Sequence, residues 1–194
     1  MLQDIKSAFR PAIALTLGFA LLLGLAYPLA VTVIGQAMFP AQANGSLIRD
    51  DGDTVIGSAL IGQAFTSDAY FHGRPSAAGA GYDAMASSGS NLAPGAKALS
   101  ARVRDDIAAL RTSPEVSISP DLVTTSASGL DPHISPEAAF SQVRRVAAAR
   151  GVPSDRIRNL IDERIERPVA GFIGEPRVNV LSLNIALDRV VPET

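Results

Sequence analysis

The sequence predicts an α+β protein, in which a single N-terminal transmembrane helix is followed by one mixed α/β domain. Three observations predict this class. Residues 11–39 contain no Asp, Glu, Lys, Arg or His. Several later segments repeat apolar residues with the helical period of 3.6. Other short segments are rich in aliphatic residues and are bounded by Gly, Asp, Asn and Pro, as strands are.

Composition narrows the classes of function. The chain has 194 residues, of which 47% are hydrophobic, and a net charge of −2. These values disfavour a disordered chain and a nucleic-acid partner. The absence of Cys excludes disulfides, thiolate nucleophiles and Cys-ligated metals. We therefore expect no metal site.

The uncharged segment at residues 11–39 is long enough to cross a membrane, because a bilayer core requires about 20 helical residues. Pro28 lies within it and is expected to kink the helix. A cleaved signal peptide is the alternative, since residues 41–43 read Ala-Gln-Ala, but the apolar part of a signal peptide spans only about 7–15 residues. A buried soluble helix would show a polar face, which this segment lacks.

The charges around the span predict its orientation. Lys6 and Arg10 precede it, whereas Arg49 follows it among three Asp residues. The positive-inside rule then places residues 1–10 in the cytoplasm, residues 11–39 in the cell (inner) membrane and residues 40–194 outside, as a periplasmic domain. Small residues spaced four apart, which allow another helix to approach closely, are Ala14 with Gly18 and Ala20 with Gly24.

The sequence of the first part of the domain predicts a hairpin, a long loop and a helix. Residues 44–65 contain two aliphatic runs around an acidic Gly-containing turn. Residues 66–91 are small and polar with interspersed aromatics, which indicates an ordered loop. Residues 96–111 have the pattern of an amphipathic helix. We expect an extended linker at 112–120, a short strand at 122–125 and a second loop at 126–135.

The last part predicts an α-hairpin and one further element. Ser135 is placed as an N-cap before Pro136, and Gly151 as the stop of that helix. A second helix starts at Ser154 and ends at Pro168. Residues 178–187 alternate in their second half, which favours a strand, with a helix from near residue 179 as the alternative.

Polar residues offer little catalytic machinery. There is no phosphate-binding loop, zinc-binding helix or nucleophile elbow. His133 could act with Asp131 and either Ser126 or Ser128 in a Ser/His hydrolase, but Asp-Pro-His is more simply a turn in which the Asp caps its own backbone. His72 is expected either to pack beside its aromatic neighbours or to contact a partner.

Two serine-rich loops are candidate anion sites, at residues 87–91 and 126–129, although such loops also satisfy their own backbone as turns. Arg74, Arg144 and Arg145 are the cations expected near them. Gln142 and Arg145 lie three apart on one helix face, for which solvent exposure is the simpler interpretation.

Several long strings resemble one family. They are YFHGRPSA at 70–77, SSGSNL at 87–92, TTSASGLDPHISP at 124–136 and GEPRVNVL at 174–181. Together with NGSLI at 44–48 and the single span, they resemble the C subunit of the bacterial Kdp potassium-transporting P-type ATPase over nearly the whole chain.

The resemblance implies a non-catalytic accessory subunit of an ATP-driven, high-affinity potassium uptake complex. The implied partners are a channel-like potassium-selecting subunit, a P-type ATPase subunit and a small accessory subunit, all in the lipid bilayer. It also implies a catalytic chaperone that raises the ATP affinity of the pump subunit, and it links the family with ATP binding. Because the positive-inside rule places the domain away from cytoplasmic ATP, we expect ATP and potassium to act at the level of the complex, with no cofactor bound directly.

The alternatives are a membrane-anchored solute-binding or sensor module and the tethered hydrolase. The partner- or nucleotide-contact candidates are His72, Arg74, Ser88, Ser90, Asn91, Ser126, Ser128, Asp131, His133, Gln142 and Arg145. We expect none of them to be catalytic.

Overall fold

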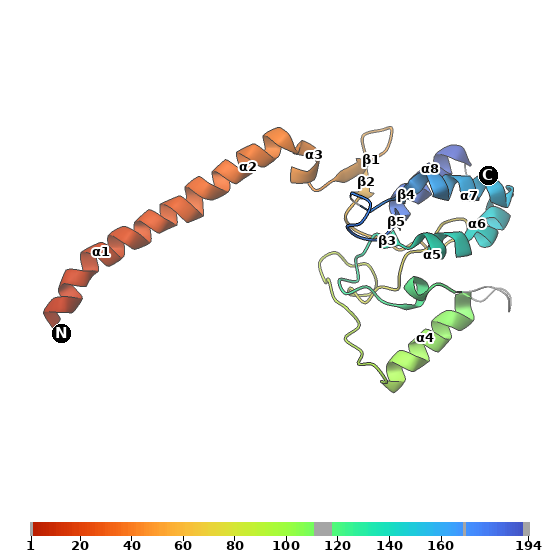
Figure 1. The fold of residues 1–194 in the computed structure, drawn as a ribbon, viewed down its shortest axis with the longest axis horizontal. Helices are drawn as coiled ribbons and strands as arrows, with labels where there is room; N and C mark the ends of the chain where they lie inside the picture. Colours follow the sequence, from red (N-terminus) through yellow and green to blue (C-terminus); the bar gives the residue numbers. More distant parts are fainter. Residues whose placement is uncertain (1, 111–117, 169, 192–194) are drawn as a thin grey trace. The chain divides into compact units, whose positions relative to one another are not determined.

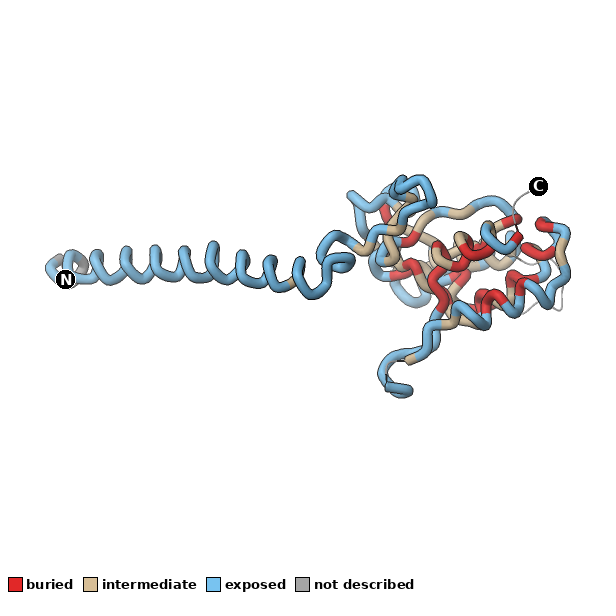
Figure 2. The backbone as a smooth tube through the Cα atoms, turned by 90° about the horizontal axis from the view of Figure 1, so that it is seen from above, coloured by how far each residue is buried: buried red, intermediate tan, exposed pale blue. Residues whose placement is uncertain are grey.

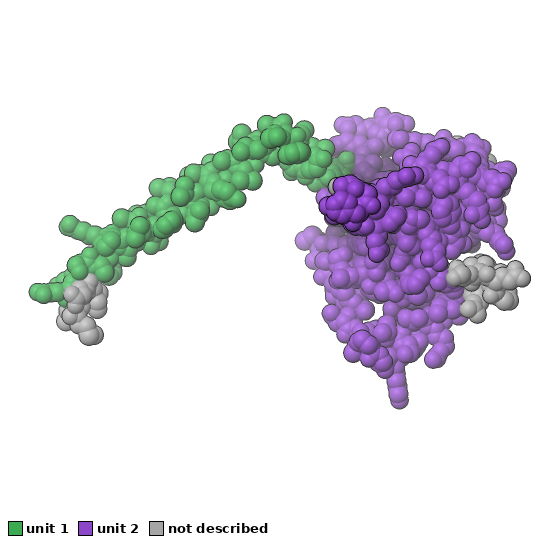
Figure 3. Space-filling view, in the orientation of Figure 1, with its two compact units in different colours: residues 1–47 green, residues 48–194 purple. Residues whose placement is uncertain are grey.

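The computed structural model describes residues 2–110, 118–168 and 170–191. It divides the chain into two compact units, Met1–Leu47 and Ile48–Thr194, coloured separately in Figure 3. Most of the linker predicted at 112–120 lies outside the described residues. Mixed helices and short strands in the second unit, after one long N-terminal helix, confirm the predicted fold class.

The first unit is a long helix drawn from red to orange in Figure 1. It consists of α1 (Leu2–Leu21), a π-helical turn (Leu22–Ala26) and α2 (Tyr27–Met38), and is followed by the short α3 (Pro40–Ala43). Residues Lys6–Met38 are long and apolar enough to cross a membrane. The disturbance predicted at Pro28 takes the form of the π turn just before it: the Tyr27 N–H donates to Leu22 O, which is five residues earlier.

The predicted hairpin is confirmed as the two-stranded sheet of β1 (Leu47–Arg49) and β2 (Val55–Ser58). Its turn is stabilised by Asp50, whose carboxylate accepts the backbone N–H groups of Gly52 at 3.0 Å and Thr54 at 2.7 Å. The predicted helix at 96–111 is α4 (Lys97–Leu110). Between β2 and α4 the structure has no helix or strand, as predicted for residues 66–91.

The strand predicted at 122–125 is wrong. Pro120–Val123 form a 3₁₀ turn, labelled η2, in which the Leu122 N–H donates to Ser119 O at 3.1 Å. Leu122 and Val123 are both buried, whereas consecutive strand residues would point to opposite faces. Pro120 at the start of the turn fixes the backbone torsion that the turn requires.

The remaining elements surround an antiparallel three-stranded sheet of order β3-β5-β4. Its registers pair His133 with Asn179 and Ile165 with Val178. Figure 1 shows α5 to α8 gathered around this sheet, with α4 set apart from them. The bounds are β3 (His133–Ile134), α5 (Pro136–Ser141), α6 (Val143–Arg150), α7 (Ser154–Arg164), β4 (Ile165–Glu166), β5 (Arg177–Asn179) and α8 (Val180–Val190).

The predicted α-hairpin is confirmed with two changes. Ser135 caps its helix by accepting the Ala138 N–H at 3.1 Å, and Gly151 ends it with a φ of +65°. The helix is interrupted at Gln142, which separates α5 from α6. The second helix begins at Ser154 as predicted but ends at Arg164, because the next residues pair with β5 as β4.

The strand favoured for 178–187 is wrong beyond Asn179, and the alternative helix is correct. Asn179 closes β5 and its side chain accepts the Ser182 N–H at 3.0 Å, which caps α8. The buried positions of α8 fall in pairs with the helical period; they are Val180, Leu181, Leu183, Asn184, Ala186 and Leu187. In a strand, successive side chains point to opposite faces, so buried residues would follow a period of two and not this pattern of pairs.

The hydrophobic core of the second unit lies between the sheet and helices α5 to α8, where Figure 2 shows most of the buried residues. Phe71 from the long loop is fully buried in this core. The loop is therefore anchored by a side chain whose burial stabilises the fold by roughly 1.5–3 kcal/mol.

Candidate functional site

The segment Tyr70–His72 pairs with no strand; instead, the side chains of Gln142, between α5 and α6, and Asn184, in α8, hydrogen-bond its backbone. Asn184 of α8 accepts the Phe71 N–H at 2.8 Å and donates to Phe71 O at 3.0 Å. Gln142 accepts the His72 N–H at 2.8 Å and donates to His72 O at 3.1 Å. The two amides thus satisfy the donors and acceptors that neighbouring strands would otherwise satisfy.

Gln142 does not face solvent, so the exposure expected for it is wrong. It is only 5% exposed, and its side chain is bonded to the backbone of His72 in the loop. Arg145 does share its face, and donates to the Gln142 side-chain oxygen at 2.7 Å and to Asp68 O at 2.7 Å. Its ion pair with the Asp68 carboxylate measures 3.7 Å.

His72 lies beside this cluster, with Nε2 3.0 Å from Ser67 O. Burial lowers the pKa of His72, and the positive charge of Arg145 lowers it further. Burial also lowers the pKa of Arg145, against the opposing effect of Asp68. The lowered pKa favours the neutral form of His72, while the Arg145 charge is paired with Asp68.

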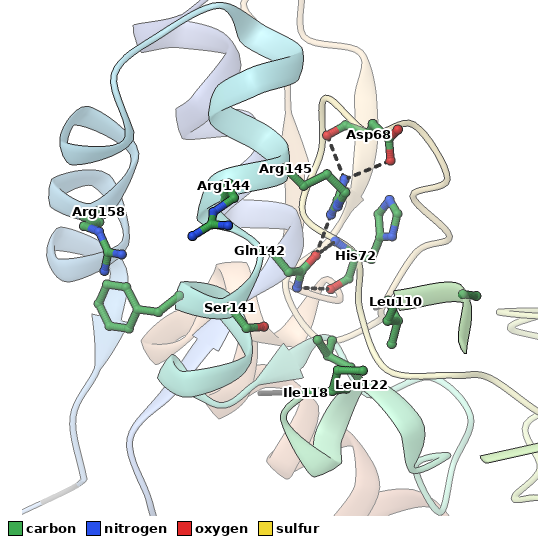
Figure 4. Close-up of a pocket in the computed structure, with 12 residues that line it drawn as sticks. Asp68, His72, Leu110, Ile118, Leu122, Ser141, Gln142, Arg144, Arg145 and Arg158 are labelled. Atoms are coloured by element: carbon green, nitrogen blue, oxygen red, sulfur yellow. Dashed lines mark hydrogen bonds and ion pairs between the residues drawn. The ribbon is translucent and has the colours of Figure 1, made fainter. Parts of the chain in front are cut away.

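These residues form one wall of a cavity of about 490 Å³, which Figure 4 shows. The other walls come from α4, η2, α5, α6 and α7. The lining residues are Asp68, His72, Ala109, Leu110, Ile118, Leu122, Phe140, Ser141, Gln142, Arg144, Arg145 and Arg158. Arg144 and Arg145 thus lie at this cavity, while Arg74 alone of the three expected cations lines a pocket with Ser126 and Ser128.

The structure brings the two serine-rich loops together. The Ser88 N–H and the Ser87 hydroxyl both donate to Ser128 O, at 3.0 and 2.9 Å. The Ser76 hydroxyl donates to Gly129 O at 2.6 Å and accepts the Tyr82 N–H at 2.8 Å. These contacts join different loop segments to one another. Within each serine-rich loop, the Ser88 hydroxyl donates to Gly89 O and the Gly129 N–H donates to Ser126 O, as the turn interpretation predicts.

Arg74, Asp131 and His133 form a second cluster. Arg74 pairs with the Asp131 carboxylate at 3.1 Å, and Asp131 Oδ1 accepts the His133 N–H at 3.0 Å. The Asp-Pro-His turn is therefore confirmed. The hydrogen bond from the His133 side chain is the largest cause lowering the pKa of Asp131.

The hydrolase geometry is incomplete in this cluster. His133 Nδ1 lies 3.4 Å from Asp131 Oδ1, but among the described contacts no hydrogen bond joins His133 to Ser126 or Ser128. A base must reach its nucleophile to activate it. Ser128 instead accepts the Leu130 N–H at 3.1 Å.

The remaining candidates lie apart. Asn91 is exposed, with a φ of +51°, and Ser90 is half-buried beside it. In the long helix, Ala14, Gly18, Ala20 and Gly24 are exposed. A Cβ built on Gly18 or Gly24 would meet nothing within 4 Å. Gly24 lies within the π turn, which rotates it relative to Ala20.

Two buried polar residues were missed by sequence reasoning. Asn184 is 1% exposed, and the side chain of Arg150 is likewise 1% exposed. Arg150 donates to Ala69 O, Val191 O and Asp188 at 2.7–2.9 Å, and lies 4.7 Å from the centre of the Tyr70 ring. A signal existed, since Arg150 is spaced from the apolar residues of α6 as a core residue would be.

Comparisons with known proteins show the family of this chain. A protein-family model described as "KdpC: K+-transporting ATPase, c chain" matches residues 9–189. The chain belongs to the KdpC family. Potassium-transporting ATPase KdpC subunits similar to it include that of Caulobacter vibrioides strain NA1000, 61% identical over 187 residues, covering 96% of this chain and 95% of the relative. That of Rhodopseudomonas palustris strain BisB18 is 55% identical over 201 residues, covering 97% and 98%.

The KdpC match confirms the resemblance drawn from the sequence strings. It extends from Phe9 in the apolar helix to Arg189 near the end of α8, and thus includes both units. Within the described residues, no group of three His, Cys, Asp or Glu could hold a metal ion.

Proposed function

We propose that this chain is the non-catalytic accessory subunit of an ATP-driven, high-affinity potassium uptake complex. Its membership of the KdpC family over both units is the observation that carries the proposal. The relatives are named as subunits of a potassium-transporting ATPase. The incomplete hydrolase geometry around His133 counts against the tethered-hydrolase alternative.

The proposed partners are a channel-like potassium-selecting subunit, a P-type ATPase subunit and a small accessory subunit. The helix Lys6–Met38 anchors the chain in the cell membrane and packs against a partner helix through Ala14 and Gly18.

The proposed topology places residues 1–10 in the cytoplasm, the span at residues 11–39 and the domain of residues 40–194 in the periplasm. Lys6 and Arg10 at the N-terminal end of the helix support it. Because the chain has no Cys, single cysteines can report the topology. An impermeant maleimide applied to spheroplasts should label Ala84→Cys and leave Gln3→Cys unlabelled; the reverse pattern would overturn this topology.

Any effect on ATP affinity is proposed to be a coupling free energy transmitted through the assembled complex. Such coupling needs no nucleotide contact with this chain. The serine-rich loops support this view, because they hydrogen-bond each other through Ser87, Ser88 and Ser128. ATP and potassium are then ligands of the complex as a whole.

Purification of the tagged full chain from its native membrane in mild detergent tests the proposal. A P-type ATPase subunit and a polytopic channel-like subunit should co-purify in stoichiometric amount, with ATPase activity stimulated by potassium. If the chain is recovered alone, the proposal fails. Ligand-dependent melting of the purified chain would then test the sensor alternative.

A further inference from the structure

The cavity beside Gln142 combines an apolar interior with a basic rim. Five of its lining side chains are aliphatic or aromatic: Ala109, Leu110, Ile118, Leu122 and Phe140. Three arginines and one aspartate supply its full charges. A cavity of about 490 Å³ is within the range of clefts that hold ligands or side chains of a partner.

The three arginines differ in what they bind. Arg145 is fully engaged by Gln142 and by the Asp68 carboxylate and carbonyl. Arg144 of α6 and Arg158 of α7 are exposed, and among the described contacts neither forms a hydrogen bond or an ion pair. Figure 4 shows both on the α7 side of the cavity, whereas Arg145 is turned toward Asp68.

We propose that this cavity receives an acidic side chain from another subunit of the complex. The carboxylate would be bound by Arg144 and Arg158, because a guanidinium presents a planar fork of donors that matches a carboxylate. This inference rests on the proposed function, since it requires a partner subunit.

The chemistry of the cavity favours a polypeptide over a free anion. A small anion would pair with the rim arginines but leave the half-buried Leu110 and Phe140 without an apolar contact from the ligand. A polypeptide segment supplies both parts of the match, since apolar side chains next to the acidic residue can enter the cavity. The two arginines also lie on helices α6 and α7, which fix the positions of their Cα atoms more rigidly than loops would.

The test uses the intact complex with the double variant Arg144→Glu and Arg158→Glu. Arg104→Glu is the matched control, because Arg104 is also exposed, without contacts among those described, and lines none of the described pockets. Reversal of both rim charges should weaken association about tenfold or more in a salt titration of co-purification, which corresponds to about 1.4 kcal/mol. Arg104→Glu should behave as the wild type.

A photocrosslinking residue in place of Ser141, which lines the cavity, identifies the occupant. The expected adduct contains an Asp or Glu of another subunit, and changing that residue to Arg should restore assembly of the double variant. If the wild-type complex assembles but the double variant behaves like Arg104→Glu, the inference is overturned. An adduct that contains no acidic residue, or one formed with nucleotide, would overturn it as well. A wild-type chain that does not assemble overturns both the inference and the proposed function.

Discussion

Replacing Asn184 by Leu should destabilise the domain strongly, although the two side chains have similar sizes. The change removes the hydrogen bonds to Phe71 N and Phe71 O, of 2.8 and 3.0 Å. Phe71 is fully buried and Asn184 is 1% exposed, so water cannot replace the lost partner. Two unpaired buried backbone groups cost about 1–3 kcal/mol each. After a partial offset from the apolar Leu side chain, the expected loss is about 2–4 kcal/mol.

Urea unfolding of the detergent-solubilised full chain measures this loss. Far-ultraviolet circular dichroism and tyrosine emission can both follow the transition, since the chain has three Tyr and no Trp. Asn159→Leu on the exposed face of α7 is the control, with an expected change within about 0.5 kcal/mol. A loss below about 1 kcal/mol for Asn184→Leu would show that the amide does not replace a strand partner.

Three further outcomes follow from the described contacts. Arg150→Met should cost about 3 kcal/mol in the same urea assay, because it removes a buried guanidinium from its ion pair with the half-exposed Asp188 and leaves two carbonyls unpaired; an unchanged midpoint would contradict this. Gly129→Ala should lower the melting temperature more than Gly95→Ala, since both have positive φ but only at Gly129 would a Cβ lie 2.6 Å from a carbonyl oxygen; equal effects would exclude the steric cause. The lowered pKa of His72 means that the unfolded chain binds more protons just below pH 6.5, so stability should fall as the pH falls through that window. His72→Gln should flatten this dependence in urea titrations at several pH values, and an unchanged slope would assign it to another group.

Local signals in the sequence were sufficient to predict those helices and turns whose ends are determined by residues of the same segment. Ser135 and Gly151 mark a helix because capping and left-handed closure depend on nearby backbone groups. The hairpin turn follows from Asp50 in the same way. The apolar helix is equally local, since its length alone makes it able to span a membrane.

The predictions were wrong where contacts between distant residues determine the secondary structure. Residues 178–187 alternate in part, but packing against the core and the Asn179 cap select a helix. The candidate site was predicted only in part for the same reason. The sequence placed Gln142 and Arg145 on one helix face but could not show that the helix is interrupted at Gln142. Asn184 gave no signal, because an Asn in an apolar segment does not reveal which distant backbone it binds.

The contacts also give a structural role to residues of the resemblance strings at 70–77 and 124–136. Within residues 70–77, Asn184 holds the backbone of Phe71 and Gln142 holds that of His72. The Ser76 hydroxyl donates to Gly129 O, which joins this string to the one at 124–136. Side-chain hydrogen bonds of this kind fix a long loop in one conformation without a strand. A surface fixed in this way is suited to repeated docking by other subunits, because little conformational entropy is lost when a partner binds.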